Sequence, residues 1–349
     1  MTGGVAESIV TTRLDVLVLG PERIGLVAGA YPDQLREVLE SRQLQVAAVR
    51  VLHRDAYEHV DLREAAPEAT DLLILNSHVP TSAWTNLPAL NRVVKIGRLR
   101  PGIDVAALAG CGIGYRQVAD PASISVAEHA LLLMLAAARR LGEALVPVGV
   151  TKPIGWPDPI VTTQSARLTN WLSLDASTFR LLAGSRLGII GLGEIGFEIA
   201  SRARALGMDV TYNNRNRLDP AFEAANGLRY ESKSELVASC SFVVVSSTSG
   251  PGEPPALGVD EVQSLREDAI VVNVGRGSAV DEAALIARAT SSPLGGLGLD
   301  VYMVEPVDPQ EFAGCWNTYL TAHVASLIPP SLRFEAFADC VESLLAEPV

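Results

Sequence analysis

The chain has 349 residues, of which 48% are hydrophobic and 19% charged, and its formal net charge is −12. This length favours two domains of ordinary size, and the composition is typical of packed α/β proteins and not of disordered or fibrous chains. A general nucleic-acid-binding or anionic membrane-binding surface needs a basic face, which the acidic balance argues against. We therefore expect neither nucleic acid nor a membrane among the partners.

The cysteines and the apolar segments bear on the compartment. The four cysteines are scattered and form no CxxC pair, so neither a disulfide framework nor a metal site is expected. Residues 1–13 contain no apolar stretch like that of a secretory signal. The apolar run 127–138 is too short to span a bilayer. These features predict a soluble cytoplasmic protein without a bound metal.

In the first part of the chain, short apolar runs rich in β-branched residues alternate with helical patterns. The predicted strands are residues 15–19, 45–51, 71–75, 92–96 and 112–118, and the segments between them include helices or turns at 32–41 and 105–109. Strands that alternate with helices in this way predict a parallel sheet with helices on both faces.

A long helix and an irregular segment follow. The helix is predicted over residues 125–141, with Ser123 or Ser125 as its N-cap. The segment 147–176 contains several prolines and little periodicity. A structureless stretch of this length inside a compact protein is usually a functional loop or an arm. We expect either a dimer arm or a lid there, and the composition does not decide between them.

A second series of strands and helices begins at Ser185. Its predicted strands are residues 186–190, 208–212, 241–245, 269–273, 295–299 and 318–321, and its predicted helices are 194–206 and 281–289. The tail 330–345 has a helical pattern and would be free to pack back on the first domain. The chain therefore predicts two α/β domains in succession.

A glycine-rich turn joins the first strand of the second series to its first helix. Gly191, Gly193 and Gly196 stand in the pattern GxGxxG, and Glu194 and Ile195 open the helix. In a dinucleotide-binding fold the first glycine permits a tight turn, the second lets the backbone approach a pyrophosphate, and the third lets helix and strand pack closely. The helix N-terminus would then face the phosphates. These five residues predict a dinucleotide site.

The end of the following strand bears on the choice of cofactor. A carboxylate at this place would bind the ribose 2′-OH of NAD, but residues 212–217 read Tyr-Asn-Asn-Arg-Asn-Arg. A 2′-phosphate would gain charge-assisted bonds from Arg215, and Asn214 would not repel it. NADP is therefore favoured over NAD. The alternatives are that Arg215 and Arg217 only solvate the loop or stack on adenine.

Four further residues follow predicted strands at the edge where doubly wound sheets bind ligands. Arg276 presents a guanidinium that can fork onto a substrate carboxylate. His323 carries an imidazole that can donate a proton to a carbonyl near neutral pH. Glu305 is expected to hold the other ring nitrogen and to keep the imidazole protonated, and Asp300 to bind the nicotinamide carboxamide. Together they predict reduction of a 2-keto acid by a nicotinamide cofactor.

With these residues the chain resembles the D-isomer-specific 2-hydroxyacid dehydrogenase family. The resemblance covers roughly residues 14–330 and includes the stretch SVAEHAL at 125–131, NVGRG at 273–277 and DVYMVEP at 300–306. It implies the assigned roles of the Arg, the Glu and the His, and a homodimer built largely on the cofactor domains. It leaves His129 as a structural residue outside the proton-transfer set.

The resemblance also implies a fold made of two doubly wound parallel-sheet domains. A Rossmann cofactor domain, residues 124–327 with the arm or lid at 147–176, is inserted into a flavodoxin-like substrate domain, residues 14–123 and 328–349. The C-terminal helix would return to the substrate domain.

The chain departs from the family pattern at the substrate loop. The family usually has a Gly-x-Gly here, whereas Arg100 stands where the first glycine is expected. We therefore expect Arg98, Leu99 and Arg100 to contact the substrate, and the arginines to select one with an additional anionic group. The alternative is that both arginines face solvent or a cofactor phosphate. Ala322 replaces the usual proline before the histidine, which could shift that loop.

The expected function is reduction of a 2-keto acid to a D-2-hydroxy acid, with His323 as the general acid and base. Two alternatives are kept. Residues 211–220 look somewhat like the corresponding part of formate dehydrogenases, but Glu305 suits a reaction that needs a protonated histidine. A dinucleotide-sensing corepressor on the same fold is the other alternative.

Overall fold

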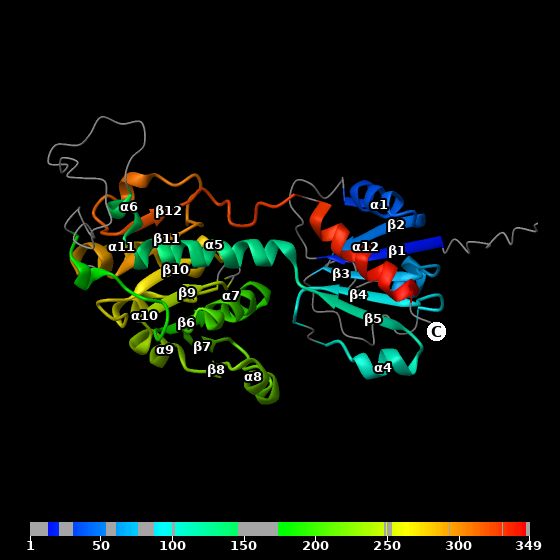
Figure 1. Cartoon of the computed structure of the whole chain (residues 1–349), viewed down its shortest axis with the longest axis horizontal. Helices are drawn as coiled ribbons and strands as arrows, with labels where there is room; N and C mark the ends of the chain where they lie inside the picture. The colour runs from blue at the N-terminus through cyan, green and yellow to red at the C-terminus, as the bar shows by residue number, and fades with distance from the viewer. Residues whose placement is uncertain are drawn as a thin grey trace, which may run out of the picture. The chain divides into compact units, whose positions relative to one another are not determined.

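The computed structural model describes residues 13–20, 31–53, 61–75, 87–99, 102–145, 174–247, 249, 253–292, 294–329 and 331–346. Arg100 and most of the predicted arm or lid lie outside these residues. The chain divides into two compact units (Figure 1). We call Met1–Ile124 with Leu327–Val349 the split domain and Ser125–Ser326 the central domain.

The described part of the split domain contains a sheet of five parallel strands in the order β2-β1-β3-β4-β5. The strands are β1 (Arg13–Gly20), β2 (Gln45–His53), β3 (Asp71–Leu75), β4 (Arg92–Ile96) and β5 (Gly114–Val118). This order is that of flavodoxin-like proteins. Every residue of β3 and of β4 is buried, as expected of parallel strands that are covered on both faces.

Helices cover the two faces of this sheet. They are α1 (Tyr31–Ser41), α3 (Leu62–Ala65), α4 (Val105–Gly110) and the C-terminal α12 (Ser331–Ala346). Side chains of α1 and α12, among them Leu35 and Phe337, form one core with Val16 of β1. Those of α3 and α4 form a second core with Leu17, the next residue of the same strand. Successive strand residues point to opposite faces, so the apolar run of β1 supplies both cores.

The described part of the central domain contains seven parallel strands in the order β12-β11-β10-β9-β6-β7-β8. They are β6 (Arg186–Ile190), β7 (Asp209–Asn213), β8 (Arg229–Tyr230), β9 (Phe242–Val245), β10 (Ile270–Asn273), β11 (Gly296–Leu299) and β12 (Thr318–Leu320). Numbered within the domain, the order is 3-2-1-4-5-6 with a seventh strand added, which is the Rossmann arrangement. The strand order reverses between β6 and β9, where ligands of such sheets bind.

The helices of this domain are α5 (Pro121–Ala138, whose first residues belong to the split domain), α6 (Leu141–Ala144), α7 (Glu194–Ala205), α8 (Pro220–Asn226), α9 (Lys233–Ser239), α10 (Val259–Gln263) and α11 (Glu282–Ser291), with short 3₁₀ turns η3 (Ala176–Thr178), η4 (Gly277–Ala279) and η5 (Pro309–Phe312). Helices α8, α9 and α10 were not predicted, because they have seven residues or fewer and so carry almost no periodic signal. The capping residues of α8 and α9 are visible in the sequence. Asp219 before Pro220 caps α8, and Ser232 forms a capping box with Glu235 at α9.

The predicted bounds of α5 are wrong at both ends. The helix begins at Pro121, and the carboxylate of Asp120 accepts the amides of Ala122 and Ser123 and the hydroxyl of Ser123. Asp120 is therefore the N-capping residue, and Ser123 is one of the groups that it binds. The helix ends at Ala138, before Arg140 in the left-handed region.

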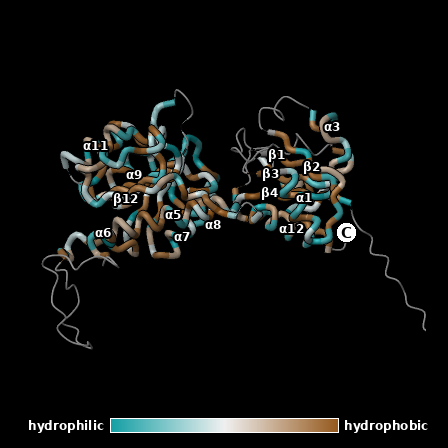
Figure 2. The backbone as a smooth tube through the Cα atoms, turned by 90° about the horizontal axis from the view of Figure 1, so that it is seen from above, coloured by the Kyte–Doolittle hydropathy of each residue, from teal (hydrophilic) through white to brown (hydrophobic). Residues whose placement is uncertain are grey.

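Among the described helices, α5 is the one long and apolar enough to cross a membrane, with 18 residues and a mean hydropathy of 1.5, and 61% of it is buried in the protein. It packs on β11, where a side chain at Gly296 would press on Ala137 and one at Gly298 on Leu133. The two glycines thus let an apolar helix lie close to the sheet. Figure 2 shows hydrophobic residues along α5. These contacts account for its hydropathy as that of a core helix.

Candidate active site

The glycine loop after β6 has the shape that a dinucleotide pyrophosphate requires. Gly191 has φ +97°, and a Cβ there would lie 2.6 Å from Ser247. A Cβ at Gly196 would collide with the carbonyl of Gly191, so only glycine lets α7 approach the strand. A Cβ at Gly193 would meet nothing within 4 Å, and no side chain caps the start of α7 at this residue. The open side at Gly193 and the uncapped amides fit a bound phosphate.

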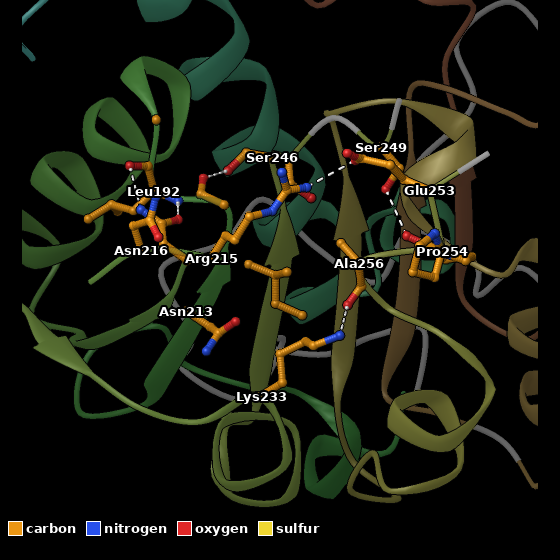
Figure 3. A pocket seen from close by; sticks show the side chains of 16 residues that line it. Leu192, Asn213, Arg215, Asn216, Lys233, Ser246, Ser249, Glu253, Pro254 and Ala256 are labelled. Carbon is orange, nitrogen blue, oxygen red and sulfur yellow. Dashed lines mark hydrogen bonds and ion pairs between the residues drawn. The ribbon is translucent and has the colours of Figure 1, made fainter. Parts of the chain in front are cut away.

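A cavity of about 900 Å3 opens beside this loop, at the carboxyl ends of β6, β7 and β9 (Figure 3). This volume is in the range of small-molecule and cofactor sites. Its lining combines the glycine loop, the residues after β7, the serines after β9, and the loop before α10: Ile190, Gly191, Leu192, Gly193, Asn213, Asn214, Arg215, Asn216, Lys233, Ser246, Ser247, Ser249, Glu253, Pro254, Pro255 and Ala256.

Asn214 and Arg215 both line this cavity but are bound differently. The Asn214 side chain accepts the amide of Leu192 at 2.6 Å and donates to its carbonyl at 3.2 Å, so it fastens β7 to the glycine loop. Arg215 is 79% exposed, and its Nη2 lies 3.0 Å from Oε2 of Glu253 across the cavity (Figure 3). Asn214 and Arg215 were both predicted site residues. Glu253 was not, because it lies 38 positions from Arg215 in the sequence.

Arg217, the second arginine of this segment, is engaged elsewhere. It donates through Nε and Nη2 to the nearly buried carboxylate of Glu223 and lies over the ring of Tyr230. The Tyr212 hydroxyl also donates to Glu223. The bonds from Arg217 and then Tyr212 hold the pKa of Glu223 below its ordinary value. Of the two arginines, Arg215 is the one that lines the cavity.

Lys233 is a second cation in the cavity lining that the sequence analysis missed. Its Nζ donates to the Ala256 carbonyl at 3.0 Å and lies 3.0 Å from Oε1 of Glu261. It thereby ties the start of α9 to the loop before α10, as seen in Figure 3. Nothing in the sequence distinguishes this lysine, since its partners lie more than 20 positions away.

Arg276 lies in a turn after β10 that is fitted between two neighbouring loops. A Cβ at Gly275 would collide with the backbone of Ser247, and one at Gly277 with the backbone of Tyr302. The buried side chain of Asn273 accepts the amide of Gly275 and donates to the carbonyl of Arg276. This explains the pattern Asn-x-Gly-Arg-Gly, because Asn273 and the two glycines hold the turn while the Arg276 side chain stays exposed.

His323 and Glu305 come together from the loops after β12 and β11. His323 Nδ1 lies 2.8 Å from Glu305 Oε2, and both side chains are about 40% exposed. Glu305 Oε1 accepts the amide of Tyr302 at 3.1 Å, which fixes the carboxylate. His323 has φ +53°, in the left-handed region that non-glycine residues rarely occupy. A carboxylate on Nδ1 leaves Nε2 as the ring nitrogen able to exchange a proton with a ligand.

Tyr302, which was not among the predicted site residues, connects the loops that carry Arg276, Glu305 and His323. Its carbonyl packs under Gly277, its amide binds Glu305, and its hydroxyl lies 2.8 Å from the carbonyls of Leu299 and Thr321. Burial raises the pKa of Tyr302 to about 12, so the hydroxyl stays a neutral donor. The tyrosine thus joins the Arg276 turn to the loops of Glu305 and His323.

The chain is similar to known proteins over most of its length. Residues 160–325 match the model of the D-isomer specific 2-hydroxyacid dehydrogenase, NAD binding domain. The chain is 30% identical over 254 residues to 2-ketogluconate reductase of Gluconobacter oxydans, covering 72% of this chain and 74% of that protein. It belongs to the D-isomer-specific 2-hydroxyacid dehydrogenase family. It is therefore an NAD(P)-dependent enzyme with a Rossmann domain.

A second relative and a solved structure are also similar to this chain. Over 225 residues the chain is 29% identical to 4-methyl-2-oxopentanoate reductase A of Aspergillus oryzae, covering 64% of this chain and less than two thirds, 62%, of that protein. A solved structure from Polaromonas sp., assigned to this same family, is 26% identical. The similarity covers 95% of this chain and 97% of the Polaromonas chain, with a TM-score of 0.52.

Asp300 of this dehydrogenase is buried, and other groups of the chain bind both its carboxylate oxygens. Its side chain is 1% exposed at the end of β11. It accepts the Thr321 hydroxyl at 2.6 Å and the amides of Val324 and Ala325 at 3.0 Å. The expected contact with a nicotinamide carboxamide stays a prediction. What the structure adds is that Asp300 binds the loop on both sides of His323.

The predicted substrate loop lies in the split domain. Arg98 is exposed and Leu99 half-buried just beyond β4, whereas Arg100 lies outside the described residues. Gly97 has φ +117° and donates to the carbonyl of Val118, so the loop leaves the sheet through a glycine turn. Substrate contact by these residues stays a prediction.

Within the described parts of the chain, no group of three His, Cys, Asp or Glu side chains is arranged to hold a metal ion. The cysteines are free thiols, of which Cys240 and Cys340 are buried. Burial raises the pKa of both thiols. These two buried thiols are therefore poor nucleophiles.

Proposed function

We propose that this dehydrogenase reduces a 2-keto acid to a D-2-hydroxy acid and that His323 donates the proton. The observation that carries the proposal is the 2.8 Å contact between His323 Nδ1 and Glu305 Oε2 in the domain that holds the glycine loop. The names of the relatives support it, since one reduces 2-ketogluconate and another 4-methyl-2-oxopentanoate. These two relatives differ in substrate, so the proposal names the 2-keto acid class and no single keto acid.

Proton transfer follows from the placement of the imidazole. Glu305 accepts the Nδ1 proton, so Nε2 carries the proton that passes to the carbonyl oxygen of the substrate. The bound nicotinamide supplies the hydride that the carbonyl carbon receives, and the C=O double bond becomes a C–O single bond that bears the hydroxyl. The ring is left neutral and takes up a new proton from solvent, to which it is 43% exposed. In the reverse direction Nε2 is the base.

Arg276 is the proposed clamp for the substrate carboxylate. A guanidinium presents two parallel N–H groups that match a carboxylate, which fixes the orientation of the keto acid. Its turn is packed against the loop of Tyr302, which also binds Glu305. An anion held at Arg276 would therefore have a defined position with respect to the proton donor. We propose in addition that Asp300 accepts a hydrogen bond from the carboxamide of the nicotinamide.

We also propose that NADPH is the preferred reductant. Arg215 lines the cavity beside the glycine loop, and Lys233, which is paired with Glu261, is a second cation of the lining. A 2′-phosphate would compete with Glu253 for the Arg215 guanidinium and would gain charge-assisted bonds. Asn214 leaves this end of β7 without a carboxylate that would bind a ribose diol. Glu253 opposes the preference because its charge repels a phosphate.

For the substrate, an additional anionic group is proposed, bound by Arg98 or Arg100 of the split domain. Arg98 is an exposed cation directly after a strand of a doubly wound sheet, the edge where such sheets bind ligands. Replacing Arg100 by Ala should raise KM for a dianionic keto acid more than for a monoanionic one. An unchanged ranking of substrates would remove the idea.

The test is oxidation of NADPH and NADH, followed by the loss of the absorbance of the reduced nicotinamide, with glyoxylate, hydroxypyruvate, a bulky apolar keto acid and a dianionic keto acid. We expect turnover with at least one of them, faster with NADPH. Arg276→Lys tests the carboxylate clamp, because lysine keeps the positive charge but lacks the two parallel N–H groups of the guanidinium. This variant should raise KM for the keto acid. Dinucleotide binding without turnover of any keto acid would contradict the proposal and favour a sensing protein.

A further inference from the structure

The loop that carries His323 is held by side chains at the residues on both sides of it. Asp300 accepts the Thr321 hydroxyl before the histidine and the amides of Val324 and Ala325 after it. His323 lies between these anchors with φ +53°. A backbone in this region persists where surrounding contacts over-determine it, and such residues cluster at functional sites.

A second set of anchors comes from helix α5. His129 Nε2 lies 2.9 Å from the Thr321 hydroxyl oxygen and 3.6 Å from Asp300 Oδ1. The Ser125 hydroxyl donates to the carbonyl of Ala325 at 2.7 Å. Ser125 and His129 are four residues apart and so lie on one face of the helix. One helix face therefore holds the His323 loop two residues before and two residues after the imidazole.

The direction of these bonds follows from counting protons. An ionised carboxylate only accepts, so the single hydroxyl proton of Thr321 points to Asp300 at 2.6 Å. The Leu299 carbonyl, at 3.4 Å from the same hydroxyl, is a much weaker acceptor. The Thr321 oxygen can then only accept from His129, which requires a proton on Nε2. His129 is 15% exposed in its side chain, so a lost bond would not be freely replaced by water.

We infer that His129, through Thr321 and Asp300, is a positioning residue that sets the backbone of His323 for proton transfer. This rests on the proposed role of His323 and goes beyond it, since His129 touches neither Glu305 nor the imidazole of His323. Ser125 is the second anchor from the same helix. Misplacing a proton donor by about 1 Å is enough to cost on the order of 10²-fold in rate.

His129→Leu and His129→Gln test the inference as a pair. Leucine removes the donor and keeps much of the volume, whereas the glutamine amide can again donate to Thr321. We expect His129→Leu to lower kcat about tenfold, with the Kd of NADPH within about twofold of the parent, and His129→Gln to recover most of the loss. Equal activity of the parent and His129→Leu, or no advantage of glutamine over leucine, would overturn the inference.

The double variant separates positioning from a general loss of structure. If His129 acts through His323, His129→Leu should cost nothing further in residual activity when His323→Ala is already present. A loss of the same size in both backgrounds would mean that His129 acts by another route, and a raised Kd for NADPH would assign it to cofactor binding through Asp300. Either result would overturn the inference.

A measurement without turnover keeps the test independent of the proposed reaction. In the NMR spectrum of the whole chain, the Cε1 proton of His323 should shift in His129→Leu and return toward the parent in His129→Gln. An unchanged resonance would contradict the inference even if no keto acid is turned over. If His129→Leu does not fold, Ser125→Ala removes the other anchor with one oxygen atom, and the same shift of the His323 resonance is expected.

Discussion

The two ends of the central sheet hold their polar groups in different ways. Beside β7, two of the charged groups that line the cavity are exposed: Arg215 at 79% and its partner Glu253 at 42%. Beside β11 and β12, the group that organises the site is Asp300, with a side chain 1% exposed and three hydrogen bonds to the neighbouring loop. After their proposed functions, we call these regions the adenosine end and the catalytic end.

The difference in burial between the two ends matches the role proposed for each of them. Exposed ion pairs are weak and rearrange easily, which suits recognition of a charged group by attraction alone. Proton transfer needs donor and acceptor within hydrogen-bond reach, so small displacements are costly. A buried carboxylate bonded on both oxygens can impose such a position. Substitutions should therefore change rate at the catalytic end and cofactor selection at the adenosine end.

The largest effect is expected for His323→Ala. Loss of the general acid should lower kcat by about 10²- to 10⁴-fold, while the Kd of NADPH, measured by fluorescence titration, stays within about twofold because the glycine loop is untouched. Glu305→Gln is the matched variant, since its amide oxygen still accepts from Nδ1 without the charge, and should give an intermediate loss. Retained activity in His323→Ala would refute the assigned role.

The glycine loop allows a comparison of two alanine substitutions three residues apart. At Gly193 the new methyl group meets open space, so the fold should be intact and the Kd of NADPH should rise about tenfold because the backbone is held off the pyrophosphate. At Gly196 the methyl group meets the Gly191 carbonyl, which should lower Tm through a cost of about 1–3 kcal/mol. Thermal unfolding measures Tm and cofactor titration measures the Kd of NADPH in both variants. Equal Tm values would contradict the expected collision at Gly196.

Much of the fold was predictable because each strand is a local apolar run. Strands β3, β4 and β6 have the predicted bounds, and the other predicted strands agree within about two residues. The two-residue strand β8 was not predicted, because it is too short to show an alternating pattern. The loops with Arg276, Glu305 and His323 were predictable for the same reason, since each follows a strand. The contact between Glu305 and His323 was also predicted, from the chemistry that a proton donor needs. The other contacts between residues far apart in sequence were not.

Those unpredicted contacts are the ones that hold the site together. Tyr302 joins three loops, Asn214 fastens β7 to the glycine loop, and Asp300 binds the residues around His323. Each depends on which strands are neighbours and on the exact course of a turn. The start of α5 at Asp120 was missed for a different reason: two serines that follow it are equally good capping residues, so the local signal is ambiguous.

At the adenosine end, Arg215 and Glu253 should have opposite effects on cofactor choice. Arg215→Ala should lower the ratio of kcat/KM for NADPH to that for NADH about tenfold, since one charge-assisted contact is lost. Glu253→Gln should raise the ratio a few-fold, because Arg215 is released and a repelling charge is removed. Steady-state kinetics with both cofactors measure the ratio, and a change of the same sign in both variants would contradict the opposition.

The adenosine end also contains a nearly buried carboxylate, Glu223, but it binds Arg217 and Tyr212 and does not line the cavity. Its pKa is held below the ordinary value of 4.5, so its stabilisation is fully present above that pH and is lost as the pH falls through the lower folded-state pKa. Glu223→Gln should therefore lower the free energy of unfolding at pH 7 by about 1–3 kcal/mol. Urea unfolding should show this difference shrinking toward acid pH, while kcat stays within about twofold. A large loss of kcat would mean that the two ends are not as separable as their contacts indicate.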